Sequence, residues 1–311
     1  MPEPPQHSRE RLARAVHSLQ GLSCGDAFGE RFFLHPEVAR PLIDQRAVPS
    51  APWRYTDDTA MAVAIAEILE EHGEVRQDPL AETFGKNFLA DPHRGYGAAM
   101  HSLLPELAST SWAWRQLAPA LFEGRGSFGN GAAMRVAPLG AYFADDLAKL
   151  TEQAELSAVI THSHPEGIAG AIAVALAAGS AWQHKDSPVS PNDFLQKICD
   201  RTPDSEVRRG IVEALALPSN TTIESAVAAL GNGAKVSAQD TVPFALWAAA
   251  SHLQNYEDAL WTTVSGLGDR DTTCAIVGGI VAMSAGFESI PKSWLESREP
   301  IPAWFLYPPT G

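Results

Sequence analysis

The sequence predicts an all-α protein, a single-domain orthogonal helix bundle whose active-site cleft lies at helix N-termini. Apolar residues recur at helical spacing through most of the 311-residue chain. No stretch of useful length alternates apolar and polar residues as a half-buried strand would, and no break in composition resembles an interdomain linker. We therefore expect one domain over residues 1–311, with residues 1–8 and about 297–311 as extended tails.

Composition indicates a globular protein and argues against two classes of partner. Hydrophobic residues make up 45% of the chain, and the formal net charge is −14. Such an acidic surface disfavours strong nonspecific binding to nucleic acid or to an anionic membrane. The most apolar run, residues 168–182, is too short to span a bilayer and predicts a buried core helix. We expect a monomer.

The cysteines and the N-terminal residues favour a cytoplasmic location. Cys24, Cys199 and Cys274 have neither the spacing of a disulfide framework nor that of a zinc site. A reducing compartment is therefore expected. Residues 1–20 are polar and charged, without the apolar core of a signal peptide.

In the first half of the chain, helical periodicity alternates with breaking residues. Ser8 is a candidate cap for the first helix, and Gly25 and Gly29 after it allow either a helix stop or a close backbone approach. Residues 32–53 are rich in proline and are expected to form a long loop. The expected helices span residues 9–23, 57–71, 80–89 and 103–122, the last interrupted at Pro105 and Pro119.

The second half begins with a glycine-rich loop at residues 124–131, which leads straight into a helix start. Alanine and glycine are frequent in the next two helices, which predicts close helix–helix contact. Residues 290–311 contain five prolines and are expected to be extended. The expected helices span residues 145–162, 165–182, 191–199, 205–217, 221–230, 242–253, 256–265 and 269–286.

Two clusters of acids and threonines open apolar helices. They are Tyr55-Thr56-Asp57-Asp58-Thr59 and Gly268-Asp269-Arg270-Asp271-Thr272-Thr273. A single Asp or Thr at such a place is most often only a helix cap. A cap needs one residue, however, so the additional acids need a reason to tolerate each other. A cation held between the two clusters would supply that reason.

The donors in these clusters are all oxygen atoms, which suits Mg²⁺ or Mn²⁺. Four carboxylates can hold two ions, and two ions about 3.5–4 Å apart can activate a shared water molecule. The residues alone therefore indicate a metal-assisted hydrolase of an anionic, phosphate-bearing substrate. They do not indicate which bond of that substrate is hydrolysed. The expected metal ligands are Thr56, Asp57, Asp58, Asp269, Asp271 and Thr272.

The glycine-rich loop and a histidine are candidates for substrate contact. Residues 127–131 precede a helix, where backbone N–H groups can bind an anion, although a plain glycine-rich turn has the same composition. The loop is neither a Walker A motif nor a dinucleotide fingerprint. His162 lies at a helix boundary, and hard cations rarely use imidazole. We therefore interpret His162 as a contact for a polar substrate group rather than as a metal ligand.

Several short motifs, in this order, resemble the ADP-ribosylglycohydrolase family, which includes the dinitrogenase reductase-activating glycohydrolases. Each is weak alone, but the ordered set is specific and extends over nearly the whole chain. The motifs are Gly25-Asp26-Ala27-Phe28-Gly29, Tyr55-Thr56-Asp57-Asp58-Thr59, Gly129-Asn130-Gly131 with the following seven residues to Pro138, Thr161-His162-Ser163, Thr241-Val242-Pro243 with Ala245-Leu246, Gly268-Asp269, Asp271-Thr272, and Ile290-Pro291 with Trp294-Leu295.

The resemblance implies an all-α fold with two Mg²⁺ or Mn²⁺ ions and a metal-bound water. The implied reaction is hydrolysis of the glycosidic bond between ADP-ribose and an acceptor, which can be a protein side chain, a nucleic acid or a small molecule. Asp58 and Glu30 are the implied catalytic residues, and the six ligands named above would hold the metals. The implied substrate-binding residues are Ser127, Phe128, Gly129, Asn130 and Gly131, with Phe128 near the adenosine end, and His162.

Two positions depart from the family pattern. Many members carry Glu four residues after the second glycine of the first motif, where this chain has Phe33, so Glu30 is the candidate for the acidic role. Arg270 stands between the two aspartates, where the family commonly has a small or uncharged residue. Two other functions stay open at this point: a non-catalytic ADP-ribose-binding module and a two-metal hydrolase of phosphate esters.

Overall fold

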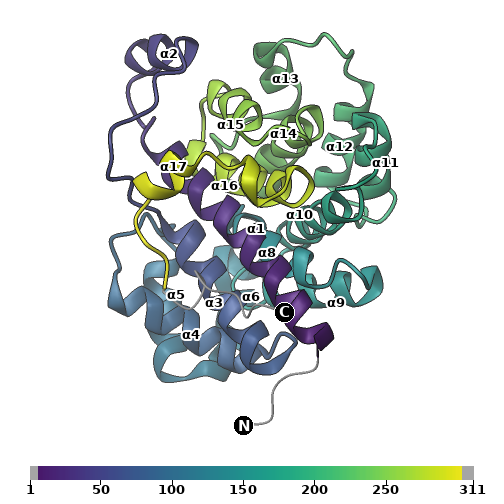
Figure 1. Cartoon of the computed structure of the whole chain (residues 1–311). Coiled ribbons are helices and arrows are strands. Elements are labelled where there is room, and N and C mark those ends of the chain that lie inside the picture. Colours follow the sequence, from purple (N-terminus) through teal and green to yellow (C-terminus); the bar gives the residue numbers. More distant parts are fainter. Residues whose placement is uncertain (1–5, 303–311) are drawn as a thin grey trace.

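The all-α prediction is confirmed. The structure is a computed structural model that describes residues 6–302, apart from the side chains of Gln6 and His7. Within these residues the chain folds into helices joined by loops, and the sole β-structure is a pair of isolated bridges. Figure 1 shows α1 crossing the molecule diagonally, with α3, α4 and α5 packed on one side of it and α10 to α14 on the other.

The helices in the described part of the chain have the following bounds. They are α1 (Gln6–Glu30), α2 (Pro36–Asp44), α3 (Asp57–His72), α4 (Gln77–Ala90), α5 (Met100–Ser109), α6 (Trp114–Gly124), α7 (Gly131–Met134), α8 (Ala137–Tyr142), α9 (Leu147–Ala158), α10 (Pro165–Gln183), α11 (Pro191–Cys199), α12 (Glu206–Ala216), α13 (Ile223–Leu230), α14 (Ala238–Ser251), α15 (Tyr256–Ser265), α16 (Arg270–Ala285) and α17 (Lys292–Ser297), with 3-10 turns at Ser111–Ala113 and Phe287–Ser289.

α1 and α16 cross antiparallel at backbone contact in the centre of the molecule. A Cβ atom added at Gly25 would overlap the carbonyl of Cys274, and one added at Gly29 would overlap the carbonyl of Arg270. Glycine is therefore needed in α1 because only a missing side chain lets the two backbones approach this closely. The consequence is that the last turn of α1 lies against the first turn of α16, where the second acid cluster begins.

The first helix differs from its prediction at both ends. α1 begins at Gln6, so residues 6–8 are not part of a loose tail and Ser8 lies inside the helix rather than capping it. Gly25 and Gly29 do not stop the helix, because packing against α16 outweighs their low helix propensity. Residues 1–5 lie outside the described part of the chain.

Proline-based predictions were less reliable than periodicity. The predicted loop at residues 32–53 contains α2, in which Pro36 occupies the first turn, where a missing N–H costs nothing. Pro105 and Pro119 lie at helical positions inside α5 and α6; the chain breaks instead between these two helices and at residues 121–123, where α6 is kinked. α17 lies in the C-terminal stretch predicted to be extended, and residues 303–311 lie outside the described part.

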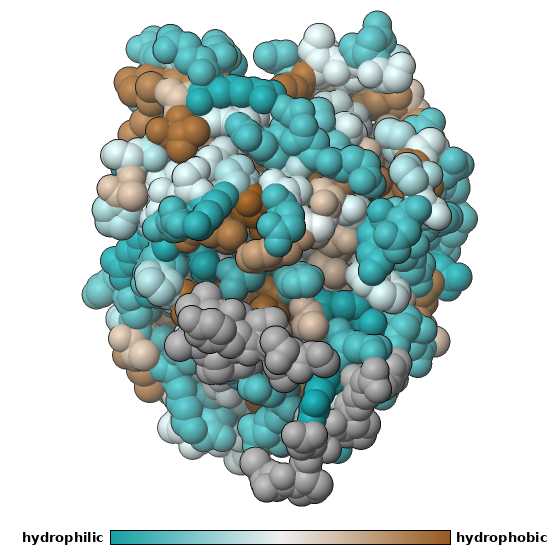
Figure 2. Space-filling view, in the orientation of Figure 1, coloured by the Kyte–Doolittle hydropathy of each residue, from teal (hydrophilic) through white to brown (hydrophobic). Residues whose placement is uncertain are grey.

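α10 is the buried centre of the second group of helices. By length and composition it could cross a membrane, but 78% of its apolar window is buried inside the fold. Its predicted role as a core helix is therefore confirmed. Figure 2 shows a mostly hydrophilic face with apolar side chains gathered near α2. Exposed apolar residues in that region are Phe33, Leu34, Val38, Leu42 and Val48.

Candidate active site

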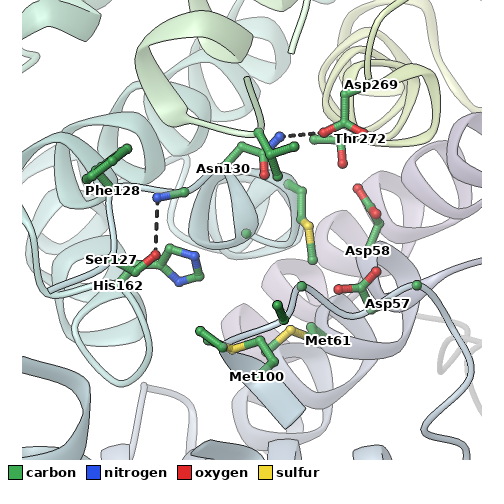
Figure 3. Close-up of a pocket in the computed structure, with 18 of the residues that line it drawn as sticks. Asp57, Asp58, Met61, Met100, Ser127, Phe128, Asn130, His162, Asp269 and Thr272 are labelled. Atoms are coloured by element: carbon green, nitrogen blue, oxygen red, sulfur yellow. Dashed lines mark hydrogen bonds between the residues drawn. The ribbon is translucent and has the colours of Figure 1, made fainter. Parts of the chain in front are cut away.

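A cavity of about 460 Å³ opens where the N-terminal ends of α3, α7 and α16 meet. Figure 3 shows the aspartates of α3 and α16 on one side of it and the glycine-rich loop with His162 on the other. The structure therefore brings both acid clusters and the loop to one space. Predicted site residues that line the cavity are Asp57, Asp58, Asp269, Asp271, Thr272, Ser127, Phe128, Gly129, Asn130, Gly131 and His162.

The start of α3 is organised by Asp26, a fully buried residue of α1. Its carboxylate accepts hydrogen bonds from the backbone N–H groups of Thr56 and Thr59, and from both of their hydroxyls, at 2.5–3.1 Å. Burial raises the pKa of Asp26 to about 6 despite these donors. Asp26 lies within the first family motif but was not predicted to be a site residue; its place between Gly25 and Gly29 was the available signal.

Thr56 is the N-cap of α3 rather than part of the cavity wall. Its hydroxyl lies 2.9 Å from both Asp26 Oδ1 and Asp58 Oδ2, and it accepts from the backbone N–H of Asp58. The Asp57 N–H donates to the carbonyl of Arg94 at 2.8 Å, which fixes the loop after α4 against the same helix start. Thr56 therefore holds Asp58 in place from behind.

Asp57 and Asp58 are almost completely buried in the first turn of α3, at 8% and 1% exposure. Burial, with the charge of Asp26 as the next cause, raises the pKa of Asp57 to about 8 and that of Asp58 well above its usual range. Oδ1 of Asp58 has no hydrogen-bond partner among the described residues. A buried carboxylate oxygen without a donor is the kind of atom that a cation would satisfy.

Asp269 and Asp271 form the opposite side, at the start of α16. Asn130 Nδ2 donates to Asp269 Oδ2 at 2.7 Å, and the Thr272 N–H donates to Asp271 Oδ1 at 2.8 Å. Burial raises the pKa of both carboxyls, and in Asp271 the charge of Asp269 adds to the effect. Asp271 in turn contributes to the raised pKa of Asp58, so the charges of the two helix starts act on each other.

The donor set fits a hard divalent cation, although it does not enclose one. In residues 6–302 no three His, Cys, Asp or Glu side chains are arranged to hold an ion as they stand. The carboxylates instead face a shared space from two helices, as Figure 3 shows for Asp57, Asp58 and Asp269. Mg²⁺ keeps several water ligands and needs only one or two carboxylates. The oxygen-only chemistry and the unpartnered Asp58 oxygen therefore agree with the predicted ion type.

The glycine-rich loop forms the wall opposite the aspartates. The Gly129 N–H donates to Ser127 Oγ at 3.2 Å, which curls the loop. Asn130 Nδ2 also lies 3.1 Å from Thr241 Oγ1, so this one amide links the loop to α14 as well as to Asp269. The first N–H groups of α7 have no acceptor within their own helix. The loop can therefore present backbone donors to an anion.

His162 is buried beneath this loop. A Cβ atom at Gly129 would lie 3.2 Å from His162 Nε2, and one at Gly131 would lie 2.8 Å from Cε1 and 3.0 Å from Nε2, so the ring packs tightly against this loop. Thr161 Oγ1 lies 2.7 Å from Nδ1. Burial, together with the positive charge of Arg135, lowers the pKa of His162 to about 3. The imidazole is therefore neutral at physiological pH.

One end of the cavity carries two aromatic rings, of which the sequence analysis predicted only Phe128. Phe122 and Phe128 both line it, with ring centroids 6.0 Å apart. Phe122 has φ +51°, as does Val236 on the facing loop, and such values are strained for bulky residues. The helix predicted over residues 103–122 was expected to be interrupted at Pro119, but the kink falls at residues 121–123 and turns Phe122 into the cavity. Lys235, also in the lining, is the single Lys or Arg there.

Glu30 is not brought into the cavity. It is the last residue of α1, it is exposed, and it lines a neighbouring hollow together with Phe33 and Leu42. The end of α1 nevertheless lies against the start of α16, so Glu30 is near Asp271 without sharing its cavity. Among the two residues predicted to be catalytic, the structure therefore places only Asp58 in the cleft.

Several known proteins are similar in sequence to this chain over almost its full length. The family model described as ADP-ribosylglycohydrolase matches residues 7–305. The chain is 29% identical to ADP-ribosylhydrolase ARH3 of Xenopus tropicalis, over 93% of this chain and 91% of that protein. It is 28% identical to ADP-ribosylhydrolase ARH3 of Homo sapiens, over 93% and 90%. It is 24% identical to ADP-ribosylarginine hydrolase Tri1 of Serratia proteamaculans, over 92% and 75%.

A solved structure described as an ADP-ribosylglycohydrolase-related protein complex has the same fold. Its TM-score is 0.63 at 21% identity, with 93% of each chain covered. The resemblance stated from the motifs is confirmed, and the relatives are named as ADP-ribosylhydrolases. The chain therefore belongs to the ADP-ribosylglycohydrolase family and is a hydrolase that acts on glycosyl bonds.

Proposed function

We propose that this hydrolase cleaves the glycosidic bond between ADP-ribose and an acceptor, and that it needs two Mg²⁺ or Mn²⁺ ions to do so. One observation carries the proposal: two acid-bearing helix starts and the glycine-rich loop share one cavity of about 460 Å³. Such a cavity falls in the size range of small-molecule sites. The family match supports an ADP-ribosylated substrate.

The charges of the cavity indicate the orientation in which the substrate binds. The aspartates repel phosphates, so the diphosphate belongs on the loop at residues 127–131, where backbone N–H groups can bind it. Phe122 and Phe128 offer ring faces to a flat base at one end. The ribose next to the scissile bond then extends toward Asp58 and Asp271. This places the adenosine and the reacting carbon at opposite ends of the cavity.

Asp57, Asp58, Asp269, Asp271 and Thr272 would hold the metal ions, with Thr56 supporting Asp58 from behind. When bound, such ions supply positive charge for the ribose oxygens and lower the pKa of a water molecule. The chain's own contribution is to fix the carboxylates before substrate arrives. Asp26 fixes the start of α3, and Asn130 fixes Asp269 while it also shapes the loop.

The test is release of ADP-ribose from arginine-linked, serine-linked and nucleic-acid-linked substrates, with Mg²⁺, with Mn²⁺ and with a chelator. We expect release from at least one class, and loss of that release in the chelator. Asp57→Asn should lower the rate by more than about 100-fold, the scale of losing one group that stabilises developing charge. Asp186→Asn, a change on the exposed surface, is the matched control.

Two outcomes would overturn the proposal. One is full activity in chelator, which would show that the reaction does not require metal ions. The other is an absence of turnover on all three substrate classes although ADP-ribose binds, which would make the cleft a binding site. The second outcome corresponds to the binding-module alternative, and it would agree with a cavity that lacks Glu30.

A further inference from the structure

Arg135, the residue that follows α7, is fully buried beneath the glycine-rich loop and acts as a hydrogen-bond donor on several sides. One terminal nitrogen donates to Thr161 Oγ1 at 2.9 Å and to the carbonyl of Ser157 at 3.0 Å. The other donates to the carbonyl of Gly131 at 3.2 Å. The guanidinium also lies 4.6 Å from the ring centroid of Phe84. Because a guanidinium has no acceptor, every contact with it fixes the direction of the hydrogen bond.

The hydrogen bond from Arg135 to Thr161 also determines the direction of the hydrogen bond between Thr161 and His162. The Thr161 hydroxyl accepts from Arg135 and lies 2.7 Å from His162 Nδ1. Thr161 is fully buried, and no other partner of its hydroxyl exists in the described residues. If Nδ1 carried hydrogen, the hydroxyl proton would have no acceptor, which is the unfavourable case for a buried polar group. The hydroxyl therefore donates to Nδ1, and the hydrogen of the neutral ring is on Nε2.

Nε2 is the ring atom that faces the substrate loop. It lies beside Gly129 and Gly131, and His162 is part of the cavity lining. Among residues 6–302, the hydrogen bond of the His162 ring is made at Nδ1, and none is made at Nε2. Figure 3 shows the imidazole beneath the loop, on the side opposite the aspartates. A donor directed there matches an oxygen of the bound anion.

We propose that Thr161, itself oriented by Arg135, is a positioning residue that fixes His162 as its Nε2–H tautomer, so that the imidazole donates a hydrogen bond to a phosphate or ribose oxygen of the ADP-ribose unit. The inference rests on the proposed function for the identity of the ligand. It adds two buried residues that touch no substrate but decide which ring nitrogen can donate to it.

The first experiment measures the tautomer directly, by nitrogen NMR on protein with isotope-labelled histidine, using His162→Gln to assign the resonances. Wild-type protein should show Nδ1 of His162 as a hydrogen-bonded acceptor and Nε2 as the protonated nitrogen. In Thr161→Val the Nδ1 resonance should move toward that of an acceptor without a partner, and in Thr161→Ser it should return. A wild-type ring protonated on Nδ1 would overturn the inference whatever the enzyme does.

The second experiment measures affinity for ADP-ribose and the kinetic constants. Thr161→Val should weaken ADP-ribose binding and raise KM about tenfold, equal to about 1.4 kcal/mol, with kcat little changed. Thr161→Ser should restore both values. His162→Gln, whose amide nitrogen reaches about as far as Nε2, should bind better than His162→Asn, whose amide reaches only about as far as Nδ1.

The matched control is Thr202→Val. Thr202 is 3% exposed and its hydroxyl donates to the carbonyl of Ile198, so this variant also loses one buried hydroxyl bond. It should leave ADP-ribose affinity unchanged. Wild-type affinity in Thr161→Val, or equal losses in Thr161→Val and Thr161→Ser, would refute the positioning role. Failure of wild-type protein to bind ADP-ribose would instead refute the proposed function, while the NMR result would still decide the tautomer.

Discussion

The guanidinium of Arg270 lies over the ring of Phe33, 5.2 Å from its centroid, and donates a hydrogen bond to the carbonyl of Phe32 at 2.5 Å. Arg270 and Phe33 are the two positions at which the sequence departs from the family pattern. Neither lines the main cavity. The two departures therefore form one contact, which ties the first turn of α16 to the turn that follows α1.

Because of this contact, we expect substitutions of Arg270 and Phe33 to lower stability in a non-additive way. Arg270→Lys keeps the charge but loses the planar group that stacks and reaches the carbonyl, so the free energy of unfolding should fall by about 1–2 kcal/mol. Phe33→Leu should cost a similar amount. Urea unfolding of the two single variants and the double variant tests the coupling, with Arg40→Lys on the exposed face of α2 as control. Losses that simply add in the double variant would show that the two side chains act independently.

A second prediction separates the structural from the metal-binding role of the aspartates. Asp57→Asn and Asp271→Asn should each remove the stabilisation that wild-type protein gains from Mg²⁺ or Mn²⁺. In chelator the same variants should be as stable as wild type or more so, because a buried carboxyl group whose ionisation the fold disfavours is gone. Thermal unfolding with and without metal provides the measurement. Variants that unfold in chelator would mean that these carboxylates are needed for the fold itself.

A third prediction concerns pH in metal-free protein. The pKa of Asp57 rises from 3.8 to about 8 on folding, chiefly because of burial. Between these values the folded state holds a proton that the unfolded state has lost, so this group makes stability fall as pH rises from about 4 to about 8. The decline should be shallower in Asp57→Asn. Denaturant midpoints at several pH values in chelator test this, and parallel curves for the two proteins would contradict it.

A fourth prediction addresses the crossing of α1 and α16. Gly25→Ala places a methyl group on the carbonyl of Cys274, and backbone cannot yield as a flexible side chain would. We expect a loss of about 3 kcal/mol or more, in the upper range for single substitutions. Gly97→Ala, where an added Cβ meets nothing within 4 Å, is the matched control. Equal stability of the two variants would show that the helices separate without strain.

The sequence predicted the long helices well because their apolar faces repeat regularly. α11 and α15 have the predicted bounds, and α3 and α10 differ by a residue at one end. Prediction from the sequence failed where tertiary contact overrides local propensity, as at Gly25 and in the predicted loop that contains α2. Helix propensity alone cannot show that a glycine will lie against another backbone.

Within the site, the acid clusters and the glycine-rich loop were visible because they carry several polar residues together. Asp26, Arg135 and Thr161 lie within the family motifs, but their roles were not predicted, because each acts by supporting another residue. Phe122 was missed for a different reason: an interruption was expected at Pro119, but the position of the kink two residues later, and the direction in which it turns Phe122, could not be inferred from the sequence.

The antiparallel contact between α1 and α16 has a consequence for synthesis on the ribosome. Asp26 and the start of α3 leave the exit tunnel first, whereas Asp269 and Asp271 follow more than 200 residues later. Nascent chains begin to fold from their N-terminal side, but distant pairings must wait for both partners. Half of the acidic cleft therefore exists before its counterpart has been translated, and a chain released early would lack α16 and any capacity to hold an ion between the two helix starts.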